Sequence, residues 1–165
     1  MRPANSIRVS VIHYALVLGR RKCTQRMTGS RPISVDAVNH MDKTGRPSLG
    51  RLTTHVLDTR NGEPGAGMTI EFSVLEAGRW RPIKTVSSNA DGRTDEPLLA
   101  GEAMKTGEYR LVFHVAAYFR AKGDKLPEPP FLERVPIRFG IADPAAHYHV
   151  PLLCSPWSYS TYRGS

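Results

Sequence analysis

Short stretches in which apolar and polar residues alternate make up most of the chain from residue 51 onward. In residues 68–75 Met, Ile, Phe and Val occupy every second position, with Thr, Glu and Ser between them, which is the pattern of a half-buried strand. Similar alternation, or a run of β-branched residues, marks four further segments: residues 52–57, 80–86, 109–115 and 133–141. This pattern predicts a protein made mainly of short strands.

Turn signals separate these segments. Asn-Gly at residues 61–62 and Asn-Ala-Asp-Gly-Arg at residues 89–93 are typical of tight turns, and Ala-Gly at residues 77–78 predicts a hairpin. Pro136 places its strand at a sheet edge or a bulge, because proline has no backbone N–H to donate. Residues 116–122 predict about two turns of helix. Several short strands with one small helix favour an all-β sandwich.

The net charge of +8 lies almost wholly in the first 50 residues. Residues 1–50 contain nine basic residues and only two acidic ones, Asp36 and Asp42. Residues 51–165 contain fourteen basic and thirteen acidic residues. A domain that binds nucleic acid would carry its own basic face, so we expect no nucleic-acid partner. We divide the chain into a basic N-terminal extension, residues 1–50, and one folded domain, residues 51–165.

The extension has three interpretations: a disordered segment, a targeting segment, or a start codon assigned too early. Its apolar run, residues 7–19, is shorter than the roughly 18 residues that cross a bilayer, and basic residues 20–22 follow where a signal peptide has small ones. We expect no membrane segment and a cytoplasmic location, with the periplasm or an organelle as alternatives. Cys23 and Cys154 provide neither a disulfide framework nor a metal clip.

Histidines and one loop arginine are candidates for chemistry. His147 and His149 lie two residues apart, so their side chains would point the same way in a strand. With His55 they would suit a three-histidine zinc site with an open position, although a lone strand histidine also fits a hydrogen-bonded core or surface role. Arg93 stands in a turn, where its guanidinium would grip a carboxylate or a pair of carbonyls. His114 is predicted to face solvent.

The C-terminal residues 159–165, Tyr-Ser-Thr-Tyr-Arg-Gly-Ser, gather aromatic, basic and small polar side chains at an end that many proteins leave frayed. They would form an edge strand that packs on the sandwich, or they would line a pocket. Pattern and composition leave both alternatives open. They indicate a β-sandwich with a polar site that contains histidine.

Three motifs resemble one known family. They are Leu-Thr-Thr-His-Val-Leu-Asp at residues 52–58, Asn-Ala-Asp-Gly-Arg at residues 89–93, and His-Tyr-His-Val-Pro-Leu-Leu at residues 147–153 with a terminal Tyr-Arg-Gly-Ser. In this order and spacing the chain resembles the 5-hydroxyisourate hydrolases, the transthyretin-related enzymes of urate breakdown. The resemblance covers residues 51–165, with modest departures at Gly65 and Leu132.

This resemblance implies a transthyretin-like β-sandwich of two four-stranded sheets with one short helix, assembled as a homotetramer with active sites in a channel between dimers. It implies hydrolytic opening of the six-membered ring of 5-hydroxyisourate to 2-oxo-4-hydroxy-4-carboxy-5-ureidoimidazoline, without metal or cofactor. The residues that it assigns to catalysis are His55, Arg93, His149 and Ser165. Those that it assigns to substrate binding are His55, Arg93 and Tyr162.

A neutral imidazole near its own pKa is a suitable base for the activation of water. On this resemblance we expect His55 and His149 to flank the water and the leaving ring nitrogen, and Arg93 to stabilise the charge of the tetrahedral centre. Tyr162 would orient the substrate ring, and Ser165 with its carboxylate would fix a histidine tautomer or the arginine. Which histidine is the base stays open.

The main alternative within this fold is a small-ligand or hormone carrier similar to transthyretin itself. Such carriers lack the histidine of the first motif, have a smaller residue in place of His149 and do not end in Tyr-Arg-Gly-Ser. This chain has all three features of the enzymes. The resemblance therefore favours the hydrolase.

Overall fold

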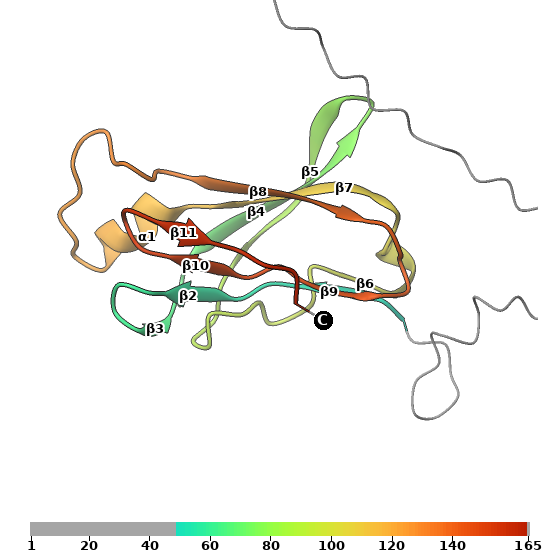
Figure 1. Ribbon diagram of the computed structural model, residues 1–165, viewed down its shortest axis with the longest axis horizontal. Coiled ribbons are helices and arrows are strands. Elements are labelled where there is room, and N and C mark those ends of the chain that lie inside the picture. Colours follow the sequence, from blue (N-terminus) through green and yellow to red (C-terminus); the bar gives the residue numbers. More distant parts are fainter. Residues whose placement is uncertain (1–48, 165) are drawn as a thin grey trace, which may run out of the picture. The chain divides into compact units, whose positions relative to one another are not determined.

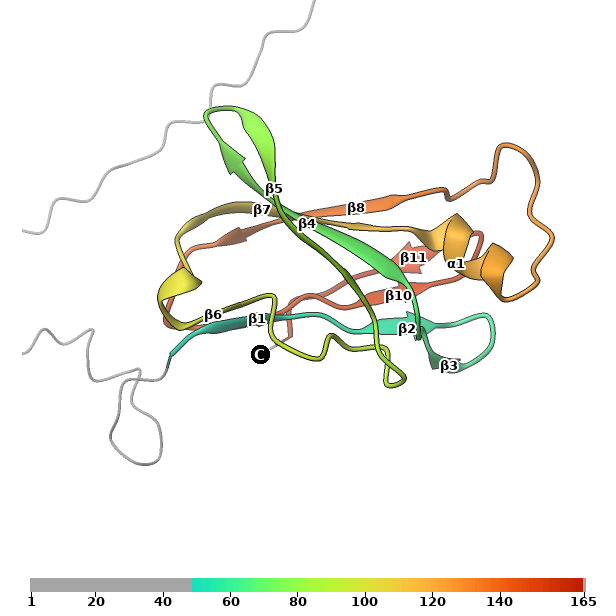
Figure 2. The same ribbon diagram turned by 180° about the vertical axis from the view of Figure 1, so that it is seen from behind.

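The computed structural model describes residues 49–164, so the predicted extension lies almost entirely outside the described residues. Within them, no helix is long and apolar enough to span a membrane. The strands form two layers, with one short helix near one end (Figures 1 and 2). In chain order the elements are β1 (Arg51–Thr53), β2 (Val56–Asp58), β3 (Glu63–Pro64), β4 (Thr69–Glu76), β5 (Arg79–Ser87), β6 (Leu99–Ala100), a 3₁₀ turn (Gly101–Ala103), β7 (Gly107–Phe113), α1 (Val115–Ala121), β8 (Val135–Ile141), β9 (His147–His149), β10 (Leu152–Cys154) and β11 (Tyr159–Ser160).

One layer is a four-stranded antiparallel sheet in the order β5-β4-β7-β8. Its first two strands form the predicted hairpin around residues 77–78. The alternation predicted for β4 is confirmed, because Ile70 and Phe72 are completely buried while Glu71 between them is partly exposed. β8 pairs only with β7, which confirms the edge position predicted from Pro136.

The second layer agrees with the second four-stranded sheet that we predicted, although a local break divides its hydrogen-bond ladder into two short segments. Their orders are β6-β1-β9 and β11-β10-β2-β3, and β1 with β9 and β2 with β10 run parallel. The break falls where the Thr54 hydroxyl donates to the Val150 carbonyl (2.7 Å) and where Pro151 has no N–H to donate. Two backbone hydrogen bonds of 3.0 and 2.8 Å cross the break, so β1 and β2 continue one strand, as β9 and β10 do.

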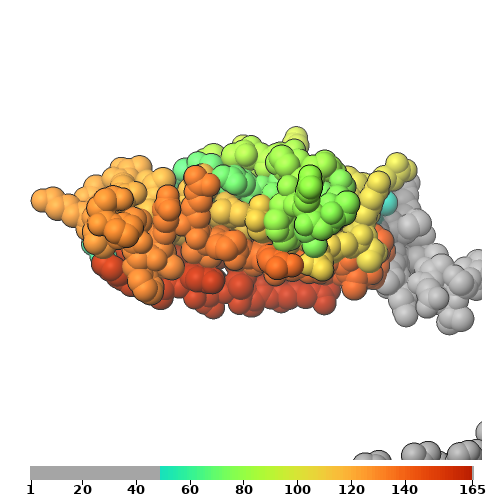
Figure 3. All heavy atoms as spheres, turned by 90° about the horizontal axis from the view of Figure 1, so that it is seen from above, coloured from blue at the N-terminus to red at the C-terminus, as the bar shows by residue number. Residues whose placement is uncertain are grey.

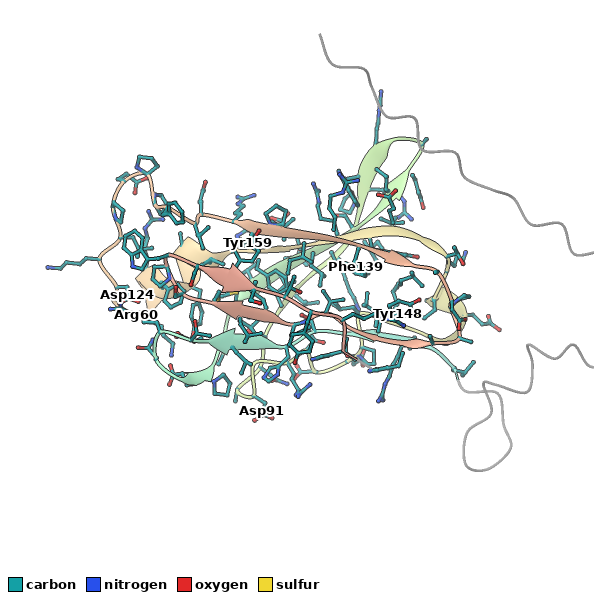
Figure 4. The ribbon with its side chains drawn as sticks, viewed as in Figure 1. Arg60, Asp91, Asp124, Phe139, Tyr148 and Tyr159 are labelled. Carbon is teal, nitrogen blue, oxygen red and sulfur yellow. The ribbon has the colours of Figure 1, made fainter. Side chains whose placement is uncertain are left out.

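An apolar core fills the space between the layers. Its largest completely buried side chains come from both layers and from α1, among them Leu52, Phe72, Phe113, Phe119 and Leu152. The Tyr109 ring stacks between Phe72 and Phe139, with centroid distances of 5.7 and 6.1 Å. At the α1 end, an ion pair between Arg60 and Asp124 (2.9 Å) joins the segment after β2 to the segment after α1 (Figure 4).

The prediction that His114 faces solvent is wrong. It immediately precedes α1, its side chain is 20% exposed, and its Nε2 lies 2.7 Å from Glu71 Oε1. The residue therefore links the end of β7 to the neighbouring strand β4, because the two strands are paired there.

A second polar group, the Asp58 cluster (Asp58, Tyr118 and Cys154), is buried where β2, β10 and α1 meet. The Asp58 carboxylate is a full acceptor: it receives hydrogen bonds of 2.8–3.0 Å from the backbone N–H groups of Arg60 and Asn61, the Asn61 amide and the Tyr118 hydroxyl. Burial, followed by contact with Asp58, raises the pKa of Tyr118 and of Cys154 to about 12. Both groups are thus protonated and unreactive at neutral pH.

Candidate active site

One face of the β1–β9 pair carries polar side chains at successive positions. In the parallel register Arg51 lies opposite His147, and Thr53 lies opposite His149. Because alternate residues of a strand share a face, these four side chains form two neighbouring cross-strand pairs, which we call rungs: Arg51 with His147, and Thr53 with His149. The residues between them are buried. The prediction that His147 and His149 point the same way is confirmed.

His55 is the next residue on this face, and a turn brings Arg93 beside it in an isolated antiparallel bridge. The Asn89 side chain holds this turn, because its oxygen accepts hydrogen bonds from the backbone N–H groups of Asp91 and Arg93 at 3.1 and 3.0 Å. Gly92 has φ +72°, and a Cβ there would lie 2.3 Å from a carbonyl oxygen of β2. Only glycine permits this close approach. Figure 4 labels Asp91 at the tip of the turn.

An open polar recess lies over the rungs and is lined by Arg51, Thr53, Arg93, His147 and His149. His55 lies beside it, with its ring centroid 6.4 Å from that of His149 and the two rings inclined by 44°. The Thr53 hydroxyl lies 2.9 Å from Nδ1 of His149. Three of the predicted site residues, His55, Arg93 and His149, thus come together from three separate parts of the chain.

The recess favours neutral imidazoles. Burial lowers the pKa of His55 below 6.5, and the Arg93 charge lowers it further, against a hydrogen bond to the Asp91 backbone that raises it. Burial also lowers the pKa of His149, followed by the charge of Arg93 and the two neighbouring histidines. A neutral imidazole has a free lone pair, so both rings are able to accept a proton at neutral pH.

The C-terminal tail is fixed to the site by backbone pairing. Gly164 and His149 exchange two backbone hydrogen bonds, of 3.2 and 2.9 Å. A Cβ on Gly164 would lie 3.0 Å from Cβ and Cδ2 of His149, so the tail passes directly over this histidine. In Figure 3 the C-terminal strands run along one side of the molecule. Ser165, which we expected in the site, lies outside the described residues.

Tyr162 lies elsewhere in the single chain. It is 56% exposed and lines an apolar groove at the edge strand β8, together with Phe139, Tyr148 and Val150. Arg163 stacks its guanidinium on the Tyr148 ring at 4.6 Å. Of the two alternatives for the tail, β11 forms the edge strand, and the residues after it border this groove. The role of Tyr162 toward a substrate stays a prediction.

The three histidines of the zinc alternative do not form a cluster in the described residues. Within residues 49–164, no group of three or more His, Cys, Asp or Glu side chains converges on a metal position. His147 is also engaged elsewhere, because its Nδ1 accepts a hydrogen bond from Nε of Arg51 at 2.8 Å.

Sequence reasoning assigned no role to Arg51 or Thr53, although both line the recess. The signal lay in the spacing of residues 51, 53 and 55, which share one face of a strand. In the sequence Arg51 lies at the predicted domain boundary, and Thr53 is one of the β-branched residues of the predicted strand.

A sequence profile described as the HIUase/Transthyretin family matches residues 52–164. The chain belongs to this family. Membership of the HIUase/Transthyretin family confirms the resemblance drawn from the three motifs and the transthyretin-like sandwich expected from it.

The proteins similar to this chain include enzymes and a transthyretin in complex with thyroxine. 5-Hydroxyisourate hydrolase 2 of Rhizobium meliloti (strain 1021) is 60% identical over 116 residues, which are 70% of this chain and 97% of the relative. The crystal structure of (S)-allantoin synthase has a TM-score of 0.68 and 45% identity, over 72% of this chain and 44% of that one. Sea bream transthyretin in complex with thyroxine has a TM-score of 0.63 and 29% identity, over 69% of this chain and 94% of that one. The chain thus spans less than half of the allantoin synthase.

Proposed function

We propose that this chain hydrolyses 5-hydroxyisourate to 2-oxo-4-hydroxy-4-carboxy-5-ureidoimidazoline in the breakdown of urate. The observation that carries the proposal is the grouping of His55, His149 and Arg93 at one open polar recess. The 60% identity with a 5-hydroxyisourate hydrolase, over 97% of that enzyme, supports the same reaction.

The reaction opens the six-membered ring at an imide-like C–N bond. The oxygen of water bonds to the ring carbonyl carbon, the water proton passes to a neutral imidazole, and the carbonyl oxygen becomes an oxyanion. Collapse of this tetrahedral centre breaks the C–N bond, and the leaving nitrogen takes a proton from an imidazolium. The new carboxylic acid then ionises. The His55 and His149 ring centroids lie 6.4 Å apart, so one bound substrate is able to contact both imidazoles.

Arg93 supplies positive charge where the oxyanion develops. Arg93 is exposed at the recess, and a donor that meets the developing oxyanion contributes about 10²–10³ in rate. The Thr53 hydroxyl fixes the orientation of the His149 ring through Nδ1 and leaves its other nitrogen for the reaction.

The tail residues complete the proposed site. Ser165 follows Gly164, which pairs with His149, and this neighbourhood supports a role for it in fixing a histidine tautomer. Tyr162 is proposed to orient the substrate ring, a role that requires it to leave the groove beside β8 or to act in the site of another copy.

The second candidate is a carrier, because sea bream transthyretin in complex with thyroxine shares the fold. The recess argues against an apolar ligand of that kind. Its five lining residues are two arginines, two histidines and a threonine, and burying such groups against an iodinated aromatic ring would leave their hydrogen-bonding atoms unpaired.

The assembly is proposed to be a homotetramer in the cytoplasm. The unpaired edges of β8 and β11, with the apolar groove beside β8, support association between copies. Light scattering of the purified chain tests the tetramer, and cell fractionation tests the compartment.

The decisive measurement is the ultraviolet absorbance decay of freshly generated 5-hydroxyisourate with the full chain, compared with the spontaneous rate. We expect strong acceleration, and we expect Arg93→Gln to lower it by about a hundredfold or more. Arg79→Gln is the matched control, because it removes an exposed arginine from the β4–β5 hairpin, outside the recess. No acceleration by the folded wild type, or full activity in Arg93→Gln, would overturn the proposal.

A further inference from the structure

The outer rung of the recess, Arg51 with His147, is not used by the proposed chemistry. Both side chains line the recess and lie in register across β1 and β9. They stand one rung beyond Thr53 and His149, at the end of the row away from His55. Residues two apart in a strand are about 7 Å apart, a span comparable with the long dimension of a purine-sized ring.

Their hydrogen bond fixes the proton of His147. Nε of Arg51 lies 2.8 Å from Nδ1 of His147. An arginine side chain has only donors, so Nδ1 must be the acceptor, and the proton of the neutral ring is on Nε2. Burial and the Arg51 charge both lower the pKa of His147, which keeps this tautomer at neutral pH.

The unused atoms of the pair are all donors. Within residues 49–164, Nε2 of His147 and the terminal nitrogens of Arg51 make no hydrogen bond, and the Arg51 side chain forms no ion pair. A carboxylate or carbonyl partner is what a guanidinium and an imidazole N–H together recognise. At one end of the row lie groups suited to proton transfer, and at the other lies a pair that only donates.

We propose that Arg51 and His147 form an oxygen-binding pair that holds the substrate by the ring carbonyls at the end away from the scissile bond. This inference rests on the proposed hydrolysis of 5-hydroxyisourate and adds two substrate-binding residues to its site. The pair places the far end of the substrate, so that the scissile bond lies between His149 and His55.

Two substitutions of His147 separate binding from strand packing. His147→Asn keeps an acceptor near the position of Nδ1 for Arg51 but removes the Nε2–H donor. His147→Gln keeps an N–H near the position of Nε2 but loses the acceptor that orients Arg51. Arg51→Gln removes the charge, and Arg79→Gln, outside the recess, removes an equal charge as the control.

Steady-state kinetics of 5-hydroxyisourate decay with the full chain provide the test. We expect His147→Asn and Arg51→Gln to raise KM by about tenfold with kcat within about twofold, because the lost contact holds substrate and transition state alike. His147→Gln retains part of the affinity, and Arg79→Gln matches the wild type. Melting temperatures of the four variants stay close to that of the wild type.

Two results would overturn the pair as a substrate contact. One is an unchanged KM in both Arg51→Gln and His147→Asn. The other is a joint fall of kcat and melting temperature, which indicates that the pair only holds β1 to β9. A wild type that does not accelerate the decay refutes the proposed function itself, so the two failures are distinguishable.

Discussion

The recess and the Asp58 cluster both include residues of the second layer, yet they differ in exposure and in the number of unpaired polar atoms. The cluster is closed: Asp58 is 1% exposed and its carboxylate accepts four hydrogen bonds. The recess is open, and its arginines and histidines keep nitrogen atoms without partners in the described residues. A buried polar group with all its hydrogen-bond partners stabilises a fold. Unpaired polar groups that converge at a surface are typical of a ligand-binding site.

Burial acts on both places in the same sense, with opposite chemical results. It raises the pKa of Tyr118 and Cys154 to about 12, so these groups keep their protons. It lowers the pKa of His55 and His149, so these rings lose theirs. A neutral phenol or thiol is protonated and therefore unreactive, whereas a neutral imidazole is the form that accepts a proton. Burial therefore makes Tyr118 and Cys154 unreactive, and it makes His55 and His149 available as bases.

The largest difference should appear on removal of His149. His149→Ala is expected to lower kcat/KM for 5-hydroxyisourate by about a hundredfold or more, because a general base or acid is lost. His114→Ala is the matched histidine control, since His114 pairs with Glu71 instead of lining the recess, and its activity should stay within about twofold of wild type. Similar losses in both variants would contradict the assignment.

Asp58→Ala should produce the reverse profile. Its removal leaves the Tyr118 hydroxyl and two backbone N–H groups without their acceptor, at a cost of about 2–4 kcal/mol in unfolding free energy. Tyr118→Phe removes a single hydrogen bond and should cost about 1 kcal/mol. Urea denaturation measures both, and kcat per folded molecule should remain that of the wild type. A loss of kcat without a loss of stability would contradict the conclusion that Asp58 acts only in the stability of the fold.

Gly164→Ala tests how closely the tail positions His149. The added Cβ would lie 3.0 Å from Cβ and Cδ2 of His149, and displacement of the ring is expected to lower kcat by about tenfold. Gly107→Ala is the control, because a Cβ there would meet only the Tyr109 ring, at an ordinary contact distance of 3.7 Å. Equal kcat in the two variants would show that the tail does not position the histidine.

The smallest effect is a shift in histidine titration. Since the charge of Arg93 helps to lower the pKa of both His55 and His149, Arg93→Gln should raise both pKa values toward 6.5, as measured by NMR of the imidazole carbons. In the wild type the acid limb of kcat/KM lies below pH 6.5, because the neutral rings are lost as the pH falls through their lowered pKa. Their contribution to stability is full above pH 6.5 and is lost over the same range. Unchanged imidazole pKa values in Arg93→Gln would show that its charge does not reach the rings.

Much of the fold follows from local pattern. The alternation in β4, the hairpin at residues 77–78 and the edge position of Pro136 are all short-range signals, and the structure confirms each of them. The local break in the second layer has no short-range signal, because it depends on a contact between Thr54 and Val150, which are far apart in the chain. His114 was misplaced for the same reason, since alternation gives no information about a partner such as Glu71.

The sequence by itself determined the strand-rich fold, the family and the identity of the candidate residues His55, Arg93 and His149, because each depends on residue type and local spacing. Only the tertiary structure decided which of them meet, that Arg51 and Thr53 join them, and that Tyr162 lies in a different groove. The reason is physical. A recess forms where the parallel register of β1 with β9 and the bridge from His55 to Arg93 bring distant segments together, and register is set by packing across the whole sheet.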